Sequence, residues 1–302
     1  MKSPSSLLPH LEAAHKAALP LSTGEVARYI PELANADPEL FAVAACTVAG
    51  ELAAVGDGDT ELTLQSLSKP FVYAWALEEL GSETVHAHVG VEPTGDSFDA
   101  IIQLDTANRP HNPMINAGAI AVTGLLAGQE QSRRVEQLLG RLSAWAGRPL
   151  TGIDVPVYLS ERGAGHRNRA IAHLMRHFGM LTTDVEGVLD LYYQQCSVLV
   201  TCRDLAVMAA TLANGGRNPL SGEQVLRAEL VDPVLAVMFT CGLYDAAGSF
   251  AFEIGLPAKS GVSGGILAVA PGRFGVAAFS PRLDERGTSV RDEAAIRHLA
   301  AR

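Results

Sequence analysis

The sequence predicts an α+β fold in which strands from both ends of the chain form one antiparallel sheet. Two short apolar segments lie near the N-terminus, and an alternating apolar pattern returns after Gly248. The long region between them has the 3.6-residue periodicity of helices. Because an isolated hairpin is marginally stable in water, we expect the early and late strands to pair. The helical region is then an insertion packed over the sheet, and helices at the termini cover its other face.

The predicted strands fall into an early and a late group. The early pair, at 41–48 and 51–55, is joined by a tight turn at Ala49-Gly50. In the late group, apolar alternation covers 249–255, the Lys-Ser-Gly region at 259–261, 265–270 and 273–280, with a Pro271-Gly272 turn. From this pattern we expect three late strands.

The predicted helices occupy the middle of the chain and its end. One helix begins at Ser66 and ends at Gly81, a typical stop signal, and Pro70 lies close enough to its start to be tolerated. Another follows a Thr201 cap, with Asp204 three residues later. Periodicity predicts the others at 115–126, 131–146, 169–178 and 185–195, and a final helix begins at Val290. With no composition break or repeat, we expect 1–302 to be a single domain.

Composition excludes several function classes. The 302 residues carry 23 Lys plus Arg against 33 Asp plus Glu, a formal charge of −10, which opposes a nucleic-acid partner. No apolar run reaches the ~20 residues that a membrane span needs, and the N-terminus lacks the apolar core of a signal peptide. The four cysteines form no CxxC pair. We therefore expect a cytoplasmic protein with free thiols and no membrane partner.

Ser66 and Lys69 form an S-x-x-K motif at the start of a predicted helix. Residues at i and i+3 share one helix face, so a nucleophile and a candidate base are neighbours. A lysine removes the serine proton only when it is neutral, which requires burial or a second cation to lower its pKa from ~10.4. The motif by itself also occurs by chance at helix starts.

A second motif, Lys259-Ser260-Gly261, lies on a predicted late strand. It is similar to the K-T-G element that accompanies S-x-x-K in class A β-lactamases and penicillin-binding proteins. The S-D-N element of those enzymes is not evident. A β-lactamase or D-Ala-D-Ala peptidase relative therefore stays an alternative, which turnover of nitrocefin would identify.

Two other patterns are weaker. His173 and His177 share a predicted helix face, but Leu174 stands where the H-E-x-x-H zinc motif needs glutamate. The glycines within 261–265 lack the G-x-x-x-x-G-K-[ST] pattern of a phosphate-binding loop. We expect no metal and no cofactor.

Nine collinear segments carry a resemblance that covers nearly the whole chain: 26–34, 64–69, 89–95, 111–120, 160–168, 189–197, 207–216, 241–245 and 256–265. In these segments the chain resembles the serine-dependent glutaminase family. The resemblance implies a serine β-lactamase-like fold and the hydrolysis of L-glutamine to L-glutamate and ammonia through a serine ester. It also implies a homodimer or homotetramer.

The resemblance implies roles for individual residues. Ser66 would be the nucleophile, Lys69 its general base, and Tyr192 and Tyr244 hydroxyl relays. The implied substrate contacts are Tyr29, Gln65, Ser66, Asn116, Glu161, Asn168, Tyr192, Tyr244 and Val262. Glu161 suits the α-ammonium group, and amides and phenols can donate to the α-carboxylate. Backbone N–H groups of Ser66 and Val262 would form the oxyanion hole, with Lys259 and Ser260 as possible support.

The chain departs from the family pattern at His166, Asp99 and Ala100. None of these changes removes a proposed catalytic group. A third interpretation is an amino-acid sensor that keeps the pocket without the reaction. Glutamine binding without ammonia release would favour that sensor.

Overall fold

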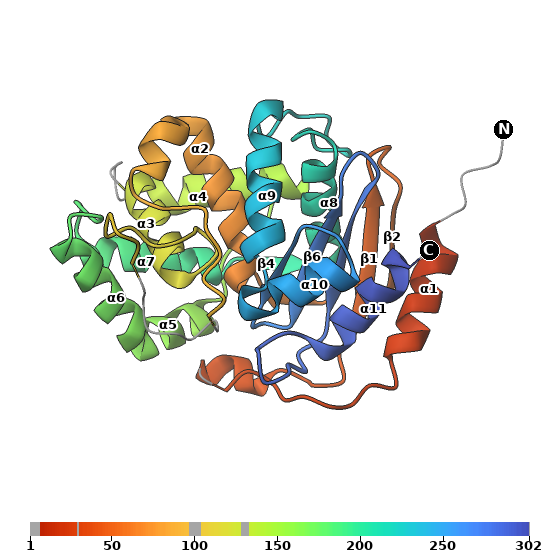
Figure 1. Ribbon diagram of the computed structural model, residues 1–302. Coiled ribbons are helices and arrows are strands. Elements are labelled where there is room, and N and C mark those ends of the chain that lie inside the picture. The colour runs from red at the N-terminus through yellow and green to blue at the C-terminus, as the bar shows by residue number, and fades with distance from the viewer. Residues whose placement is uncertain (1–6, 29, 97–103, 128–132, 302) are drawn as a thin grey trace.

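The computed structural model describes residues 7–28, 30–96, 104–127 and 133–301 and shows a sheet beside a group of helices (Figure 1). The strands are β1 (Ala42–Thr47), β2 (Leu52–Gly56), β3 (Glu61–Thr63), β4 (Leu199–Thr201), β5 (Ala258–Gly261), β6 (Gly265–Ala270) and β7 (Phe274–Phe279). The α-helices are α1 (Leu7–Ala18), α2 (Lys69–His86), α3 (Asn116–Leu126), α4 (Arg134–Ala146), α5 (Val155–Ala164), α6 (His166–His177), α7 (Val185–Cys196), α8 (Cys202–Ala213), α9 (Val231–Cys241), α10 (Ala247–Glu253) and α11 (Val290–Ala300). The 3₁₀ turns are η1 (Pro31–Asn35), η2 (Gln65–Ser68), η4 (Ala228–Leu230) and η5 (Tyr244–Ala246).

The main sheet joins the two ends of the chain, as predicted. Its strand order is β2-β1-β7-β6-β5, and all neighbours are antiparallel. The first and last strands meet in the register Ala42↔Phe279. The predicted hairpin turn is present, with Gly50 in the left-handed region at φ 88°. The predicted α+β class is therefore confirmed.

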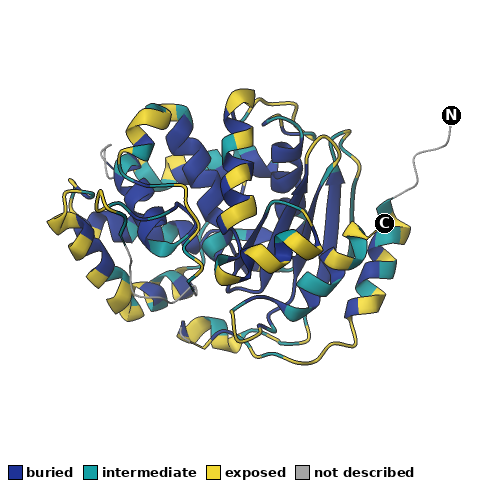
Figure 2. Ribbon diagram, in the orientation of Figure 1, coloured by how far each residue is buried: buried dark blue, intermediate teal, exposed yellow. Residues whose placement is uncertain are grey.

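Alternation along the strands separates two hydrophobic clusters. In β1, Ala44 and Cys46 belong to the larger cluster, whereas Val43 and Ala45 belong to the smaller one. The smaller cluster also contains α1 and α11 residues, and the larger extends through α8 into the helical region. Figure 2 shows the sheet as largely buried between these layers. Helices thus cover both faces of the sheet. Because both faces are buried, polar and apolar residues alternate little along the strands.

Helix α8 lies directly on the sheet and begins with the predicted cap. The Thr201 hydroxyl accepts from the Asp204 backbone N–H, and the Asp204 carboxylate accepts from the Thr201 backbone N–H, which forms a capping box. Arg148 adds a bidentate pair with Asp204, at 2.7 and 2.6 Å. The helix approaches β7 closely at Gly275, where a Cβ atom would lie 2.1 Å from the Ala210 nitrogen.

Several elements differ from the sequence prediction, and helices α5 and α9 were not predicted. The alternating segment at 249–255 lies largely in helix α10, where Phe250 is buried and Phe252 is 92% exposed. One outward phenylalanine on a short helix therefore produced the strand-like pattern. Helix α2 is bent at Gly81, with φ 78°, and continues to His86 instead of ending there. The small sheet of β3 and β4 was not predicted, because each strand has only three residues.

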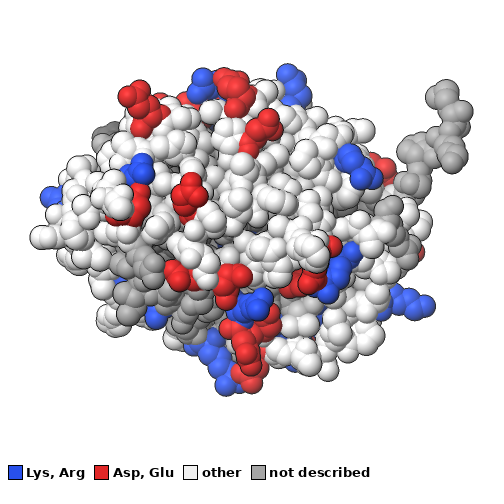
Figure 3. Space-filling view, viewed as in Figure 1, with Lys and Arg blue, Asp and Glu red and all other residues white. Residues whose placement is uncertain are grey.

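No single helix in the described part of the chain is long and apolar enough to span a membrane. The helical segments 228–241 and 244–253 are long and apolar enough only when they are counted together, and a 93° bend separates them. Figure 3 shows acidic and basic side chains interspersed over one face of the molecule.

Substitution of Gly275 by alanine tests the close contact between α8 and β7. The added methyl group meets backbone atoms, so we expect the free energy of unfolding to fall by about 1–3 kcal/mol or more. Gly140→Ala, on an exposed position of α4 with open space around it, is the matched control and is expected to be neutral or slightly stabilising. Chemical denaturation measures both variants. A free energy of unfolding for Gly275→Ala equal to that of the unaltered protein would contradict the close packing of α8 on β7.

Candidate functional site

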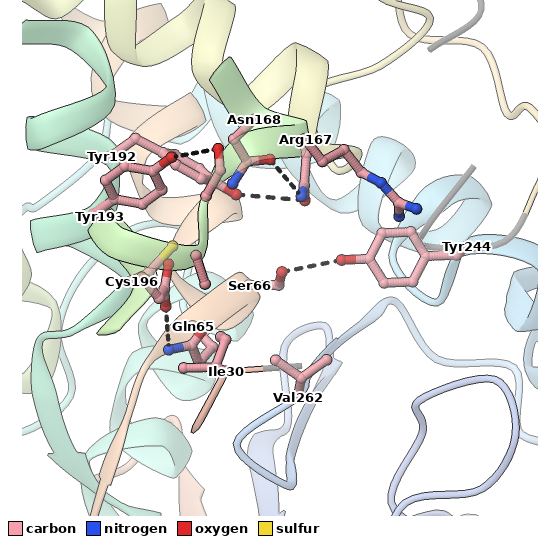
Figure 4. Close-up of a pocket in the computed structure, with 14 residues that line it drawn as sticks. Ile30, Gln65, Ser66, Arg167, Asn168, Tyr192, Tyr193, Cys196, Tyr244 and Val262 are labelled. Carbon is pink, nitrogen blue, oxygen red and sulfur yellow. Dashed lines mark hydrogen bonds between the residues drawn. The ribbon is translucent and has the colours of Figure 1, made fainter. Parts of the chain in front are cut away.

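A cavity of about 350 Å³ lies between the helical region and the edge of the sheet (Figure 4). Side chains from both parts of the fold line it. The lining residues are Ile30, Gln65, Ser66, Asn116, Glu161, Ala164, Gly165, Arg167, Asn168, Tyr192, Tyr193, Cys196, Tyr244 and Val262. This volume is in the range of small-molecule sites.

Ser66 is held by the short path from β3 into α2. Strand β3 pairs with β4, and the Leu64 backbone N–H continues that pairing by donating to the Val198 carbonyl at 2.8 Å. Gln65 then adopts the left-handed region at φ 48°, a conformation that costs about 1 kcal/mol or more for a residue other than glycine. This turn places Ser66 on the cavity wall, and Lys69 becomes the first residue of α2.

Tyr244 faces Ser66 across the cavity. Its hydroxyl donates to Ser66 Oγ at 3.1 Å and accepts from Lys69 Nζ at 3.3 Å. Figure 4 shows the Ser66 and Tyr244 side chains pointing toward one another from different elements. Tyr244 begins η5 and itself has φ 55°, and Ser66 directly follows Gln65, which has φ 48°. Each partner thus has a left-handed non-glycine backbone position at or next to it. Backbone strain of this kind gathers at functional sites.

Lys69 is buried, with 1% of its surface exposed. Besides Tyr244, its ammonium group donates to the Met114 carbonyl at 3.1 Å and to Asn116 Oδ1 at 2.8 Å. Three acceptors match the three N–H bonds of a lysine ammonium. The S-x-x-K lysine is therefore linked to the serine through a tyrosine hydroxyl.

Lys259 lies against the Tyr244 ring. Its Nζ is 4.2 Å from the ring centroid and donates to the Gly242 and Ser260 carbonyls, each at 2.7 Å. Burial lowers the Lys259 pKa to about 8, although Tyr244 opposes this change. Burial alone raises the Tyr244 pKa, but the charges of Lys259 and Lys69 outweigh it and bring that pKa down to about 7. A phenol that ionises near neutrality thus contacts the serine.

Glu161 is the buried carboxylate of the cavity, with 6% of its surface exposed. Gln65 Nε2 donates to its Oε1 at 2.6 Å. Burial raises the Glu161 pKa to about 7, against the Gln65 hydrogen bond and the Lys69 charge. A buried carboxylate in this state is well suited to a cationic ligand group, which would stabilise its ionised form.

Amide and phenol groups complete the wall around Glu161. Asn116 Nδ2 donates to Asn168 Oδ1 at 3.1 Å, and the Tyr192 hydroxyl donates to Asn116 Oδ1 at 3.4 Å. These three side chains come from α3, α6 and α7. The site therefore depends on how three helices pack, which spacing along the chain does not reveal.

Most predicted site residues meet in this cavity. Its wall contains Gln65, Ser66, Asn116, Glu161, Asn168, Tyr192, Tyr244 and Val262. Lys69, Lys259 and Ser260 are not on the wall, although both lysines contact Tyr244. Tyr29, Asp99 and Ala100 lie outside the described residues. His166 is exposed at the start of α6.

Several wall residues were not predicted, including Tyr193, Cys196, Arg167 and Ile30. One available signal was Gly165, which lies beside Tyr193. A Cβ atom at Gly165 would sit 2.0 Å from the Tyr193 hydroxyl, so only glycine fits there. Across the described ranges, no group of three or more His, Cys, Asp or Glu residues could hold a metal ion.

Sequence comparisons give one family for this chain. The glutaminase family model matches residues 24–302. A glutaminase from Nostoc sp. is 50% identical over 288 residues, which cover 95% of this chain and 86% of the relative. A glutaminase from Clostridium tetani is 46% identical over 88% of each chain.

Solved structures agree with the sequence relatives. A structure titled as the probable glutaminase YbaS superposes with a TM-score of 0.95 at 40% identity, and covers 99% of this chain and 97% of its own. A structure of Mglu in its glutamate form has a TM-score of 0.93 at 41% identity, and covers 99% of this chain and 69% of its own. The fold is thus the serine β-lactamase-like fold of these proteins. The chain belongs to the glutaminase family.

Proposed function

We propose that this protein hydrolyses the side-chain amide of L-glutamine to L-glutamate and ammonia through a γ-glutamyl ester on Ser66. The observation that carries the proposal is the contact chain from Ser66 Oγ to Tyr244 Oη to Lys69 Nζ, at 3.1 and 3.3 Å. A serine hydroxyl needs such a base to become a nucleophile. Family membership supports glutamine as the substrate.

The charges of the cavity support a zwitterionic amino acid. Glu161 is the carboxylate that binds the α-ammonium group in this proposal, and Gln65 holds it in place. Asn116, Asn168 and Tyr192 offer amide and phenol donors to the α-carboxylate. The side-chain amide then points toward Ser66. Glutamine provides all three groups.

The proposed first step forms the ester. The Ser66 oxygen attacks the amide carbon, and its proton passes to the Tyr244 oxygen as the Tyr244 hydroxyl proton moves to neutral Lys69, the general base. Neutral Lys69 beside the Tyr244 hydroxyl differs from the Lys69 ammonium beside ionised Tyr244 only in the position of one proton. Backbone N–H groups of Ser66 and Val262 stabilise the oxyanion. As the tetrahedral intermediate collapses, the C–N bond breaks, and the same pair returns the proton to the nitrogen, which leaves as ammonia.

The second step hydrolyses the ester. Water attacks the ester carbon, Tyr244 and Lys69 take its proton, and the bond to the Ser66 oxygen breaks as that oxygen regains a proton. L-glutamate leaves. Serine, tyrosine and lysine end in their starting protonation states, so the cycle needs no cofactor.

We also propose a domain organisation, a compartment and an oligomeric state. One large hydrophobic cluster runs from the sheet through the helical region, which supports one catalytic domain over 1–302. All four cysteines are buried and free, which supports a reducing compartment such as the cytoplasm. The homodimer or homotetramer rests on the family resemblance, and light scattering of the purified protein tests it.

Replacement of Ser66 by alanine tests the nucleophile. We expect ammonia release to fall about a thousandfold or more, because the covalent step is lost. Folding should be retained, since the side chain loses only one oxygen. Ser249→Ala, which removes a hydroxyl on α10 outside the cavity, is the control. Activity of Ser66→Ala within about tenfold of the unaltered protein would remove Ser66 as nucleophile.

Glu161→Gln tests the ammonium site. We expect KM to rise about tenfold or more with little change in kcat, because the α-ammonium is remote from the reacting amide. Glu161 binds the cation only when ionised, so KM of the unaltered enzyme should fall as pH rises through about 7. This dependence should disappear in the variant. Asp190→Asn, on α7 outside the cavity, is the control, and an unchanged KM in Glu161→Gln would refute the assignment.

Lys69→Arg tests the base. Arginine keeps the positive charge but cannot give up a proton in this pH range, so kcat should fall by about a hundredfold to ten-thousandfold. Lys16→Arg on the exposed side of α1 is the control. Near-normal steady-state rates in Lys69→Arg would mean that Lys69 acts only through its charge and that a tyrosine is the base.

A further inference from the structure

A chain of buried polar groups lies directly behind the nucleophile and is not on the cavity wall. Gln195 Nε2 donates to Ser68 Oγ at 2.8 Å, and the Ser68 hydroxyl donates to the Gln65 carbonyl at 2.7 Å. At the other end, the Thr123 hydroxyl lies 3.2 Å from Gln195 Oε1 and 2.8 Å from the Ala119 carbonyl. All three side chains are at most 1% exposed. We call Thr123, Gln195 and Ser68 the buried relay.

The buried relay joins three of the elements that present substrate-facing groups. Thr123 lies on α3 two helical turns after Asn116, on the same face. Gln195 lies on α7 three residues after Tyr192 and so shares its face. Ser68 lies in η2 between Ser66 and Lys69. Each relay member thus lies on the same element as a residue of the cavity wall.

Ser68, at one end of the buried relay, contacts Gln65, one of the two left-handed non-glycine residues of the site. Gln65 holds φ 48° although it carries a side chain, and such a conformation persists only where its surroundings fix it. Ser68 binds the Gln65 carbonyl, while the Gln65 side chain binds Glu161 at 2.6 Å. The next residue is Ser66. The backbone conformation of Gln65 therefore fixes the positions of both the Ser66 nucleophile and the Glu161 carboxylate.

We propose that Gln195 is a positioning residue that acts through Ser68 to hold the left-handed backbone of Gln65, and thereby aligns Ser66 with Tyr244 and Gln65 with Glu161. The inference rests on the proposed function for its kinetic consequences. Gln195 is not on the cavity wall, and its side-chain amide is hydrogen-bonded to Ser68 and Thr123. Its effect on catalysis must pass through the Ser68 hydroxyl.

Two variants break the relay at different points. Ser68→Ala removes one oxygen, and Gln195→Met keeps side-chain volume while removing the amide. We expect kcat to fall by roughly 10- to 100-fold in each, the usual effect of a misplaced nucleophile, and KM to rise by a smaller factor. Thr211→Val is the matched control. That buried threonine also donates to a carbonyl four residues back, but on α8 away from the cavity, so its rate should stay near normal.

The double variant separates positioning from general destabilisation. If Gln195 acts through Ser68, the double variant should be no slower than Ser68→Ala alone, because the second change removes a path already broken. A loss of kcat/KM in the double variant equal to the product of the two single losses would overturn the proposal. A rate for Gln195→Met within about threefold of that of the unaltered enzyme would also overturn it.

A crystal structure of Ser68→Ala gives a readout independent of activity. We expect Gln65 to leave the left-handed region and its amide to leave Glu161. Retention of φ near 48° with the 2.6 Å contact intact would overturn the proposal even if the unaltered protein released no ammonia. Absence of ammonia release from the unaltered protein, with the predicted Gln65 movement present, would instead refute only the proposed function.

Discussion

Two buried lysines around one tyrosine form the constraint on which the site depends. Lys69 and Lys259 are at most 1% exposed, and neither forms an ion pair with a carboxylate among the residues that the structure describes. Buried ammonium groups are costly unless they are compensated. Carbonyl oxygens satisfy their N–H bonds, and the hydroxyl and ring of Tyr244 face both charges. An ionised Tyr244 is the counter-charge that this arrangement favours.

The fold brings these groups together from distant parts of the chain. Lys69 begins α2, Lys259 lies on the edge strand β5, and Tyr244 begins η5 between α9 and α10. Antiparallel pairing of the two chain ends places β5 at the border of the helical region. The cavity forms at this border, so the sheet supplies one cation and the helical insertion supplies the other. Packing of the two layers therefore determines the electrostatics of the site.

Local patterns predicted the sheet and part of the site. Alternation and turn residues were enough for the main strands, whereas the S-x-x-K spacing made Ser66 and Lys69 candidates only together with the Lys259-Ser260-Gly261 element. Spacing could not select Tyr244, because its hydrogen-bond partners Ser66 and Lys69 are more than a hundred residues away; that assignment came from the family resemblance. The left-handed backbone of Gln65 has no sequence signature, since it is imposed by contacts with Ser68 and Glu161. Helix α10 was missed because a 92% exposed Phe252 imitates strand alternation.

The most direct test of the account is the ionisation of Tyr244. A spectroscopic pH titration of the phenolate signal, taken as the difference between the unaltered protein and Tyr244→Phe, isolates this residue. The account predicts one tyrosine that ionises with a pKa of about 7, and a shift of that pKa to higher values in Lys259→Met, where one neighbouring charge is gone. A difference titration that shows ionisation only near the ordinary tyrosine pKa of ~10, unchanged by Lys259→Met, would contradict it.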